Sequence, residues 1–449
     1  MKQILFLAGL AAVLSVNNVL ADSTLSNPAA PRPDWMVTNS MPATNGITLD
    51  GFLNEVAIGN LDYAAQRYNV DIAKAAVAIA REFPNPNLSL GDGRDLRFHG
   101  SQALPEPASA GIDQTVEYLG KRKWRIRTAE QSYRAAAATL EDFLRNLKLD
   151  AAEAYVAALA TQRALEQQRK ATEYLNQLVA AQKHRFDAGD IAETDLTQSR
   201  VDELQSESDL LNAENDAQTA QLALSTFLGR NRGQTTFILC GNLETIAEGG
   251  LVPHLDLSQL VEQALQNRPD LVALRHAHDS AQSGVRLAKA SRAPDLDVGV
   301  NYTYTTASEN NLAPAPSDSM LGLSLSFPLP LWNRNRAEIQ TAEDAREQAE
   351  KTLQSAELKA EVQVRQTFTS RQLMQDRVRK FQDKLLKGAD DVLTAKRFSY
   401  EHGNSTLDGL LMAQSADNDV HQAYNSALAD AAKAVMELAR AVGLSDTHF

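Results

Sequence analysis

Two segments of the chain alternate strictly between apolar and polar residues. The apolar positions of the first segment, LDVGVNYTY, are Leu296, Val298, Val300, Tyr302 and Tyr304. Those of the second, LGLSLSF, are Leu321, Leu323, Leu325 and Phe327. A period of two predicts β-strands with one apolar and one polar face, here over about residues 295–306 and 320–329. A fainter alternation predicts two further strands, at about 87–98 and 112–120.

Other parts of the chain have the composition of long helices. From Lys121 to Ala188 there is no Gly or Pro, and strong helix formers dominate. At a rise of 1.5 Å per residue, roughly 60 such residues form a rod of about 90 Å. The tetrapeptide DAGD at 187–190 is expected to reverse the chain, with Gly189 ending one helix and Asp190 capping the next. The same composition returns after Arg334, with a turn at 400–404, so we predict two long helical hairpins.

The two halves of the chain repeat one another. The stretch HRFDAGDIAETDLTQSR aligns with FSYEHGNSTLDGLLMAQ at an offset of 214, which places Gly189 on Gly403. Upstream, an offset of 208 places Trp124 on Trp332. This pattern is typical of an internal duplication. Each repeat is expected to contain a shorter helix (about 48–82 and 257–291), two strands and a hairpin, within 48–230 and 257–443.

The remaining segments surround these repeats. The opening MKQILFLAGLAAVLSVNNVLA contains a Lys, an apolar run and a small-residue site ending at Ala21, which predicts a signal peptide over 1–21. An N-terminal extended segment, a linker and a C-terminal tail are expected at 22–47, 231–256 and 444–449. Cys240 is the only cysteine, so no disulfide within the chain is expected. No later stretch reaches the ~20 consecutive apolar residues of a membrane-spanning helix.

Charge and motifs argue against several classes of function. The formal net charge is −13, which speaks against a nucleic-acid partner. No Gly-rich phosphate loop, nucleophile elbow or paired-cysteine metal motif occurs. His276 and His278 are two residues apart on a predicted helix and do not share a face. His402 and Glu401 are expected to be solvated turn residues. We therefore expect no catalytic residues, no cofactor and no metal ligands.

The four predicted strands need partners from other chains. An apolar face opposite a small polar face suits a wall between lipid and water, and strands of about ten residues match a tilted bilayer crossing. An open sheet edge cannot sit in lipid, because its backbone groups would be unpaired. The expected fold is therefore mainly α with a membrane β part whose strands close a barrel only in an oligomer, and three copies would give twelve strands. Its lipid-facing residues are expected to include Val298, Val300, Tyr302, Leu323, Leu325 and Phe327.

Several stretches resemble the TolC-like outer-membrane efflux proteins. RFDAGDIAETDL resembles the hairpin-tip motif of that family, FPLPLWNRNRAEI the segment where its second strand pair re-enters a long helix, and QALQNRPDL its opening helix. The resemblance covers nearly the whole mature chain. It implies a trimer with a barrel in the outer membrane and a twelve-helix tunnel across the periplasm. VEYLGKRKWRIRTAE is most similar to the CzcC-like heavy-metal subgroup, although a basic helix start near the membrane boundary also explains it.

The resemblance implies where partners act. The hairpin tips would dock a periplasmic adaptor and, through it, an inner-membrane pump of the RND type. The tip residues concerned are Phe186, Gly189, Tyr400 and Gly403.

The resemblance also implies a gate at the inner end of the pore. Asp195 matches an acidic position that faces the pore in the family, and an exposed or capping carboxylate is the alternative interpretation. The second tip departs from the family pattern. Gly409 and Met412 stand where acidic residues occur in the family, and Asp408 lies one residue early. A complete acidic gate is therefore not expected here.

Together these observations predict a passive outer-membrane channel of a tripartite efflux system that exports small solutes, with heavy-metal cations as the first expectation. Multidrug efflux and type I protein secretion are alternatives within the same fold. A soluble periplasmic coiled-coil scaffold is an alternative of a different class. Its weakness is that only about half of the heptad seam positions in the second helix are apolar, which is thin for a free coiled coil.

Overall fold

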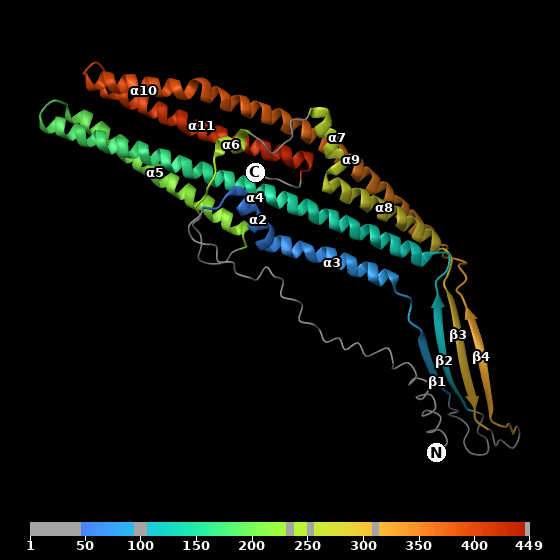
Figure 1. Ribbon diagram of the computed structural model, residues 1–449. Coiled ribbons are helices and arrows are strands. Elements are labelled where there is room, and N and C mark those ends of the chain that lie inside the picture. Colours follow the sequence, from blue (N-terminus) through green and yellow to red (C-terminus); the bar gives the residue numbers. More distant parts are fainter. Residues whose placement is uncertain (1–45, 94–105, 230–237, 249–255, 308–313, 445–449) are drawn as a thin grey trace. The chain divides into compact units, whose positions relative to one another are not determined.

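The computed structural model describes residues 46–93, 106–229, 238–248, 256–307 and 314–444. Two long helical hairpins and one four-stranded sheet account for most of them (Figure 1). The expected signal peptide lies outside the described residues, as do 22–45 of the N-terminal segment, 231–237 and 249–255 of the linker and 445–449 of the C-terminal tail. The fold class predicted from the sequence, mainly helical with four strands, is confirmed.

The first hairpin consists of α4 (Lys121–Asp187) and α5 (Glu193–Phe227). Helix α4 has 67 residues and is therefore about 100 Å long. Because it contains no Pro, no backbone hydrogen bond of its interior is lost. The prediction that Asp190 caps the second helix is wrong. Ala192 is the N-cap of α5, and the backbone N–H of Asp190 donates to the carbonyl of Arg185 (2.9 Å).

The second hairpin consists of α9 (Arg336–Lys380), α10 (Leu386–Glu401) and α11 (Leu407–Val442). The single helix expected before the second tip is interrupted by a π-helical turn, Phe381–Leu385. A π-helical turn holds an extra residue and re-aims the side chains that follow it. Here Phe381 packs against Tyr424 of α11, with ring centroids 6.2 Å apart.

The strand-to-helix junction differs between the two repeats. Trp124 lies in α4, whereas Trp332 precedes α9 and is 92% exposed. The alignment of these two residues at an offset of 208 is therefore wrong structurally. The offset of 214 that aligns the two tips also aligns the starts of the two long helices to within one residue. Lys121, the first residue of α4, falls on position 335, and α9 begins at Arg336.

Each of the two shorter helices is divided in two. The first comprises α2 (Leu49–Gly59) and α3 (Leu61–Arg81), and the second comprises α7 (Leu257–Asn267) and α8 (Pro269–Ala290). The expectation of continuous helices over 48–82 and 257–291 is corrected accordingly. Asn60 begins α3, because its side chain accepts a hydrogen bond from the N–H of Tyr63 (2.9 Å). Pro269 begins α8, because a proline disfavours helical geometry in the residue before it.

The sheet has the antiparallel order β1-β2-β3-β4. Its strands are β1 (Asn87–Asp92), β2 (Pro107–Val116), β3 (Leu296–Thr305) and β4 (Asp318–Ser326). Two predicted boundaries are corrected. The first strand ends at Asp92, not at 98, and residues 94–105 lie outside the described part. The second strand begins at Pro107 and ends at Val116, because Leu119 and Gly120 adopt φ angles of 58° and 75° that turn the chain into α4.

The strand register sorts the residues onto two faces. One row across the apolar face is Leu88, Ile112, Val300 and Leu323. The neighbouring row on the opposite face is Ser89, Gly111, Asn301 and Gly322. The glycines of this polar face leave room for longer neighbours. A Cβ on Gly299 would lie 2.0 Å from Oδ1 of Asp113, so only glycine admits that carboxylate.

The helical core is centred on Tyr155 of α4, which is fully buried. Its hydroxyl donates to the carbonyls of Ile47 (2.6 Å) and Cys240 (2.9 Å), and burial raises its pKa to about 12. Helix α11 packs on this core with small buried side chains, including Ala427, Ala431, Ala432 and Ala439. Small side chains allow neighbouring helices to approach closely.

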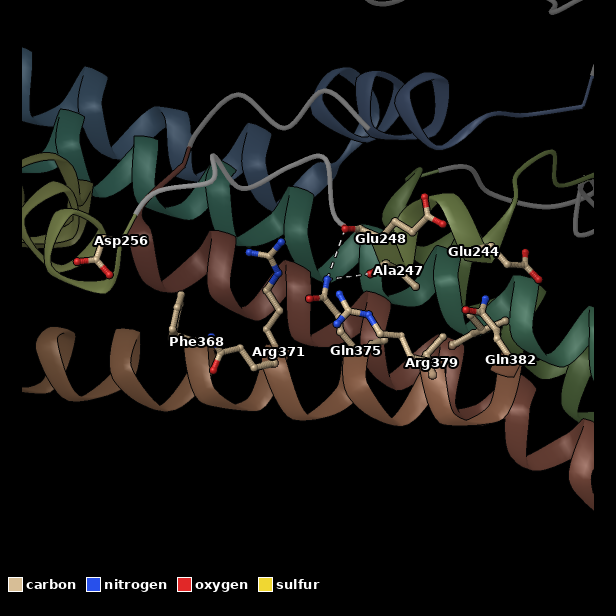
Figure 2. Close-up of a pocket in the computed structure, with 13 residues that line it drawn as sticks. Glu244, Ala247, Glu248, Asp256, Phe368, Arg371, Gln375, Arg379 and Gln382 are labelled. Carbon is tan, nitrogen blue, oxygen red and sulfur yellow. Dashed lines mark hydrogen bonds between the residues drawn. The ribbon is translucent and has the colours of Figure 1, made fainter. Parts of the chain in front are cut away.

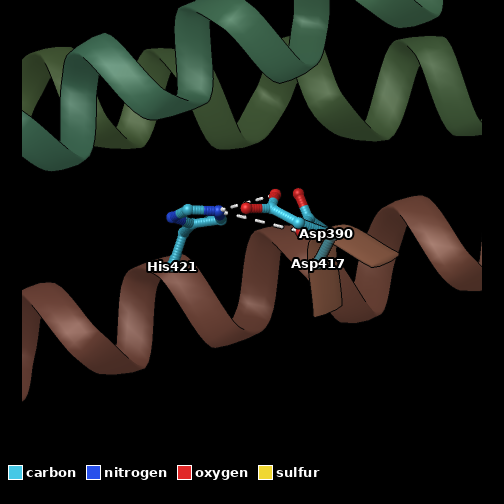
Figure 3. Close-up of side chains that lie close together, drawn as sticks. All are labelled: Asp390, Asp417 and His421. Atoms are coloured by element: carbon cyan, nitrogen blue, oxygen red, sulfur yellow. Dashed lines mark ion pairs between the residues drawn. The ribbon is translucent and has the colours of Figure 1, made fainter. Parts of the chain in front are cut away.

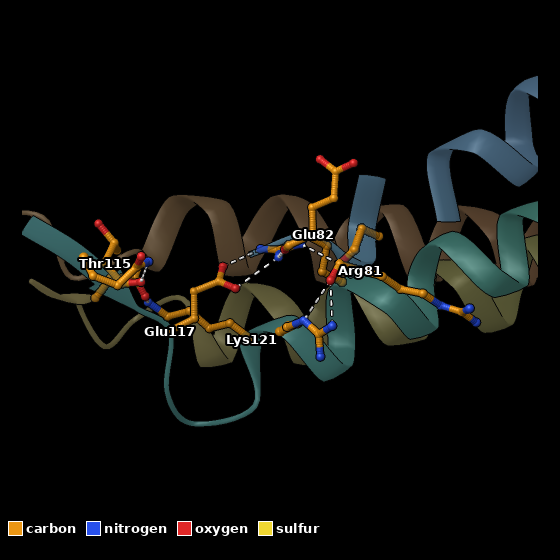
Figure 4. A network of polar contacts seen from close by, with 10 residues as sticks. Arg81, Glu82, Thr115, Glu117 and Lys121 are labelled. Carbon is orange, nitrogen blue, oxygen red and sulfur yellow. Dashed lines mark hydrogen bonds and ion pairs between the residues drawn. The ribbon is translucent and has the colours of Figure 1, made fainter. Parts of the chain in front are cut away.

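Basic residues of α4 connect the sheet to the helices through an ion pair and hydrogen bonds (Figure 4). The guanidinium of Arg125 pairs with both carboxylate oxygens of Glu117 and donates to the carbonyls of Ala80 (3.2 Å) and Glu82 (3.1 Å) at the end of α3. Arg122 donates to the carbonyl of Arg81 (2.6 Å). The Gly-Lys-Arg-Lys-Trp-Arg stretch therefore has a structural role at this junction.

Candidate functional site

The two hairpin tips have the same backbone geometry. The N–H of Gly189 donates to the carbonyl of Phe186 (2.9 Å), and the N–H of Gly403 donates to the carbonyl of Tyr400 (3.0 Å). In each tip the following N–H reaches one residue further back, which completes a Schellman motif. The φ angles of Gly189 and Gly403 are 81° and 74°, the left-handed conformation that glycine adopts without strain at the end of a helix.

Tyr400 joins the second tip to the first hairpin. Its hydroxyl accepts hydrogen bonds from Nη1 of Arg185 (2.8 Å) and from the buried amide of Gln182. The Arg185 guanidinium also lies 5.7 Å from the centroid of the Tyr400 ring. Phe186 is 37% exposed beside this contact. Of these two aromatic tip residues, Tyr400 is therefore engaged by α4, whereas Phe186 presents surface to solvent.

The candidate gate residues occupy the first turns of the returning helices. Asp195 lies in the first turn of α5 and Asp408 in the first turn of α11, and both are exposed. A carboxylate in this position interacts favourably with the helix dipole. At the second tip, Thr406 caps α11 by accepting a hydrogen bond from the N–H of Gly409 (3.2 Å). The two tips thus share their turn but start the following helix differently.

The candidate lipid-facing residues form one exposed apolar surface. Val298, Val300 and Tyr302 alternate on β3, and the register pairs the first two with Leu325 and Leu323 of β4. Leu323 is 85% exposed and Leu325 is 65% exposed. The sixth residue, Phe327, follows the last residue of β4. A contiguous exposed apolar surface of this kind marks contact with a membrane or another protein.

Within the described residues, each outer strand of the sheet is paired along one edge and unpaired along the other. Among the described strands, β1 pairs only with β2 and β4 pairs only with β3. Unpaired backbone groups cannot be left in lipid, so this sheet requires further strands if it enters a bilayer. Within the described residues, no helix is both long enough and apolar enough to cross a membrane.

A cavity of about 670 Å³ lies between α9, α11 and a short helix, α6 (Leu243–Glu248) (Figure 2). Arg371 and Arg379 line it together with Glu244 and Glu248. Burial lowers the pKa of Arg371, and its Nε has no hydrogen-bond partner among the described residues. The cavity is open to solvent and its lining mixes cations with carboxylates, so it defines no ligand.

Two histidines that the sequence singles out, His276 and His402, contact neighbouring residues of the protein. Nδ1 of His276 lies 3.0 Å from Oε1 of Gln131. His402 stacks on Phe398, with ring centroids 4.0 Å apart, and its Nδ1 lies 2.8 Å from that residue's carbonyl. A histidine that was not predicted to belong to any site, His421, lies with Asp390 and Asp417 between α10 and α11. The only sequence signal was the four-residue spacing of Asp417 and His421.

These features are typical of a class of protein: membrane channels in which an apolar sheet faces lipid and long helical hairpins extend away from it. The family model described as outer membrane efflux protein matches residues 52–230 and 260–444. The chain belongs to this family. It is an outer-membrane efflux channel of the TolC type that extends into the periplasm.

Curated relatives support this assignment. The chain is 26% identical over 304 residues to the cobalt-zinc-cadmium resistance protein CzcC of Cupriavidus metallidurans, covering 67% of this chain and 68% of the relative. It is 28% identical over 246 residues to the outer membrane protein TolC of Vibrio cholerae, covering 54% of each. It is also 25% identical over 280 residues to the fusaric acid resistance protein FusA of Burkholderia cepacia, covering 60% of this chain and 51% of the relative.

Solved structures share the fold. CusC, whose structure concerns transmembrane channel formation, superposes with a TM-score of 0.73 at 19% identity, covering 88% of this chain and 92% of that one. The outer membrane protein VceC of Vibrio cholerae superposes with a TM-score of 0.70 at 17% identity, covering 88% and 96%. The predicted membership of the TolC-like family is confirmed.

Proposed function

We propose that this channel is the passive outer-membrane conduit of a tripartite efflux system and that its cargo is heavy-metal cations. The observation that carries the choice of cargo is the similarity to CzcC, which is named for resistance to cobalt, zinc and cadmium. The passage itself requires no catalytic group of the channel, because a partner pump would supply the energy.

Assembly would follow from the open sheet edges. The β1 edge of one copy would pair with the β4 edge of the next, and three four-stranded sheets would close a twelve-stranded barrel. The apolar face with Val298, Val300, Tyr302, Leu323, Leu325 and Phe327 would face lipid. The opposite face, with Asn301 and Ser324, would line the lumen.

The tips would be the inner end of the conduit. We assign adaptor docking to Phe186, Gly189, Tyr400 and Gly403, and expect an inner-membrane pump, of the RND type, behind the adaptor. The shared turn geometry of the two tips supports this assignment, because a partner would meet the same backbone conformation at both tips. Asp195 and Asp408 would place carboxylates near the axis of a trimer, where like charges repel one another and attract cations.

Two alternatives share the fold. The similarity to FusA favours small organic toxicants as cargo, and the similarity to TolC leaves type I secretion open. A soluble scaffold is the alternative of a different class. Purification separates it from the channel, because a scaffold would stay in solution without detergent.

Deletion and complementation would test the cargo. A strain lacking this protein should lose resistance to Zn²⁺, Co²⁺ and Cd²⁺ and recover it with the intact gene. Its resistance to fusaric acid and to hydrophobic antibiotics should not change. A strain that becomes sensitive only to organic toxicants would contradict metal cargo while leaving the channel assignment in place.

A further inference from the structure

Three ionisable side chains converge between the two helices of the second hairpin (Figure 3). Asp417 and His421 are four residues apart and therefore share one face of α11. Asp390 reaches them from α10. Nε2 of His421 lies 3.7 Å from Oδ1 of Asp417 and 3.7 Å from Oδ1 of Asp390. One ligand atom from each residue falls within 4.8 Å of the other two.

The buried carboxylate of Asp417 lacks a hydrogen-bond partner for one of its oxygens among the described residues. The residue is only 5% exposed, and its Oδ1 points into the cluster without a hydrogen bond from any described residue. A buried carboxylate oxygen without a hydrogen bond is costly, and buried charges are ordinarily paired or coordinate a metal. The contact of Oδ1 of Asp417 with Nε2 of His421, at 3.7 Å, is too long for a hydrogen bond.

We propose that Asp390, Asp417 and His421 form a binding site for a divalent first-row transition-metal cation, with Zn²⁺ as the reference ion. Zinc binds imidazole nitrogen and carboxylate oxygen at about 2.0–2.2 Å, so tetrahedral ligand atoms lie roughly 3.4 Å apart. The two 3.7 Å separations in the cluster are close to that value. A small rotation of the exposed Asp390 side chain would complete three ligands, and water would take the fourth position.

The donor set favours this class of ion over Mg²⁺ and Ca²⁺. Imidazole nitrogen suits zinc, nickel and copper, whereas magnesium and calcium prefer six or more oxygen ligands. Two carboxylates and one imidazole also carry a formal charge of −2 when the histidine is neutral, which a divalent cation balances. The cation would bridge α10 and α11 within a single chain.

The first hairpin provides an internal control. At the offset of 214, Asn176, Glu203 and Glu207 stand where the second hairpin has Asp390, Asp417 and His421. In the amide orientation that satisfies its hydrogen bonds, Asn176 donates to Oε1 of Glu203 (3.2 Å). The first hairpin therefore bridges its helices at this level with an amide, and it lacks the imidazole.

This site is independent of the proposed cargo, because it concerns binding to the protein and not transport. The test uses the full chain, purified in detergent without a polyhistidine tag and stripped with a chelator. Equilibrium dialysis against ZnCl₂ should find one Zn²⁺ bound per chain. His421→Ala and Asp417→Asn should each weaken this binding about tenfold or more, since even residues behind metal ligands contribute about 10–100-fold. The matched control, Glu207→Ala, should bind as the parent does.

Bound Co²⁺ gives a second readout. Its visible absorption should report a nitrogen ligand in the parent and change in His421→Ala, a partly exposed position whose substitution leaves the core intact. If His421→Ala binds Zn²⁺ as tightly as the parent, or if the parent binds none, the cluster is only a carboxylate-imidazolium ion pair and the proposal is wrong. Neither result would bear on the deletion strain, so the site and the cargo fail separately.

Discussion

The hydroxyl of Tyr400 accepts a hydrogen bond from Arg185 at 2.8 Å, which joins the last turns of two helices that are 215 residues apart in sequence. The buried amide of Gln182 donates to the same oxygen. One aromatic residue of the tip motif thus fixes the two hairpins to each other. The equivalent residue of the first tip, Phe186, has no hydroxyl and cannot make this bond.

Tyr400→Phe should loosen the tips without affecting assembly. The variant removes the acceptor for Arg185 and leaves the buried Gln182 amide unsatisfied, a loss of about 1–3 kcal/mol. Hydrogen exchange should therefore accelerate at 184–190 and 398–404 and stay unchanged in the sheet. Tyr68→Phe, at an exposed tyrosine of α3, is the control. Equal exchange in both variants would show that the contact does not hold the tips.

Gly403→Val should impair resistance before it impairs folding. Gly403 has a φ of 74°, which would strain a β-branched residue by about 1–3 kcal/mol. A Cβ added at this position would meet no atom within 4 Å, so no steric clash is expected. The effect is therefore conformational and confined to the tip. Gly388→Val is the matched control, because Gly388 also has open space around it but lies within α10 at negative φ. Trimer yield should be normal for both, and only Gly403→Val should sensitise cells to the exported toxicant. Full resistance in Gly403→Val cells would argue against docking at this tip.

Val298→Arg should lower the amount of assembled barrel. The register places Val298 on the apolar face beside Leu325, where a lipid-facing charge costs up to about 2–4 kcal/mol, depending on its depth in the bilayer. Asn301→Arg places the same charge on the polar face and should mainly alter conductance. Heat-resistant trimers in outer-membrane extracts measure the difference. Indistinguishable yields of the two variants would mean that the faces are assigned the wrong way round.

Arg125→Lys should weaken the attachment of the sheet to the helices. Lysine keeps the charge but cannot pair with both oxygens of Glu117 and also reach the end of α3. Each hydrogen bond to a charged group that is lost costs about 1.5–3 kcal/mol. The purified variant should melt at a lower temperature than Arg127→Lys, a control at an exposed position two residues away. Equal melting temperatures would show that the motif has no role at this junction.

The long helices, the two turns and the two strands of the second repeat could be predicted from the sequence because each rests on local chemistry. A Gly-free run of helix formers, a Gly at a chain reversal and a strict period of two are all local signals. The breaks at Asn60 and Arg268 have local signals as well, a capping side chain and a following proline. They were missed because a run of helical composition continues across each of them.

The π-helical turn and the cluster of Asp390, Asp417 and His421 depend on contacts between residues far apart in the sequence, which no local pattern predicts. Phe381 is displaced toward Tyr424, a residue 43 positions later, and Asp390 meets His421 only because the hairpin folds back. The first repeat's strands were predicted poorly for a related reason. Their small residues, such as Ala108 and Gly111, are explained by neighbours across the sheet rather than by an alternating pattern.

The central claim, that three open sheets close one barrel, is tested most directly by cross-linking the two edges of the sheet. In a Cys240→Ser background, Ser89→Cys on β1 and Ser324→Cys on β4 place thiols on the polar face of opposite edge strands. A flexible bismaleimide applied to outer membranes should give covalent dimers and trimers on a denaturing gel and nothing larger, and each single-cysteine variant should give no trimer. A ladder that stops at two, continues past three or fails to form would contradict a closed three-chain barrel.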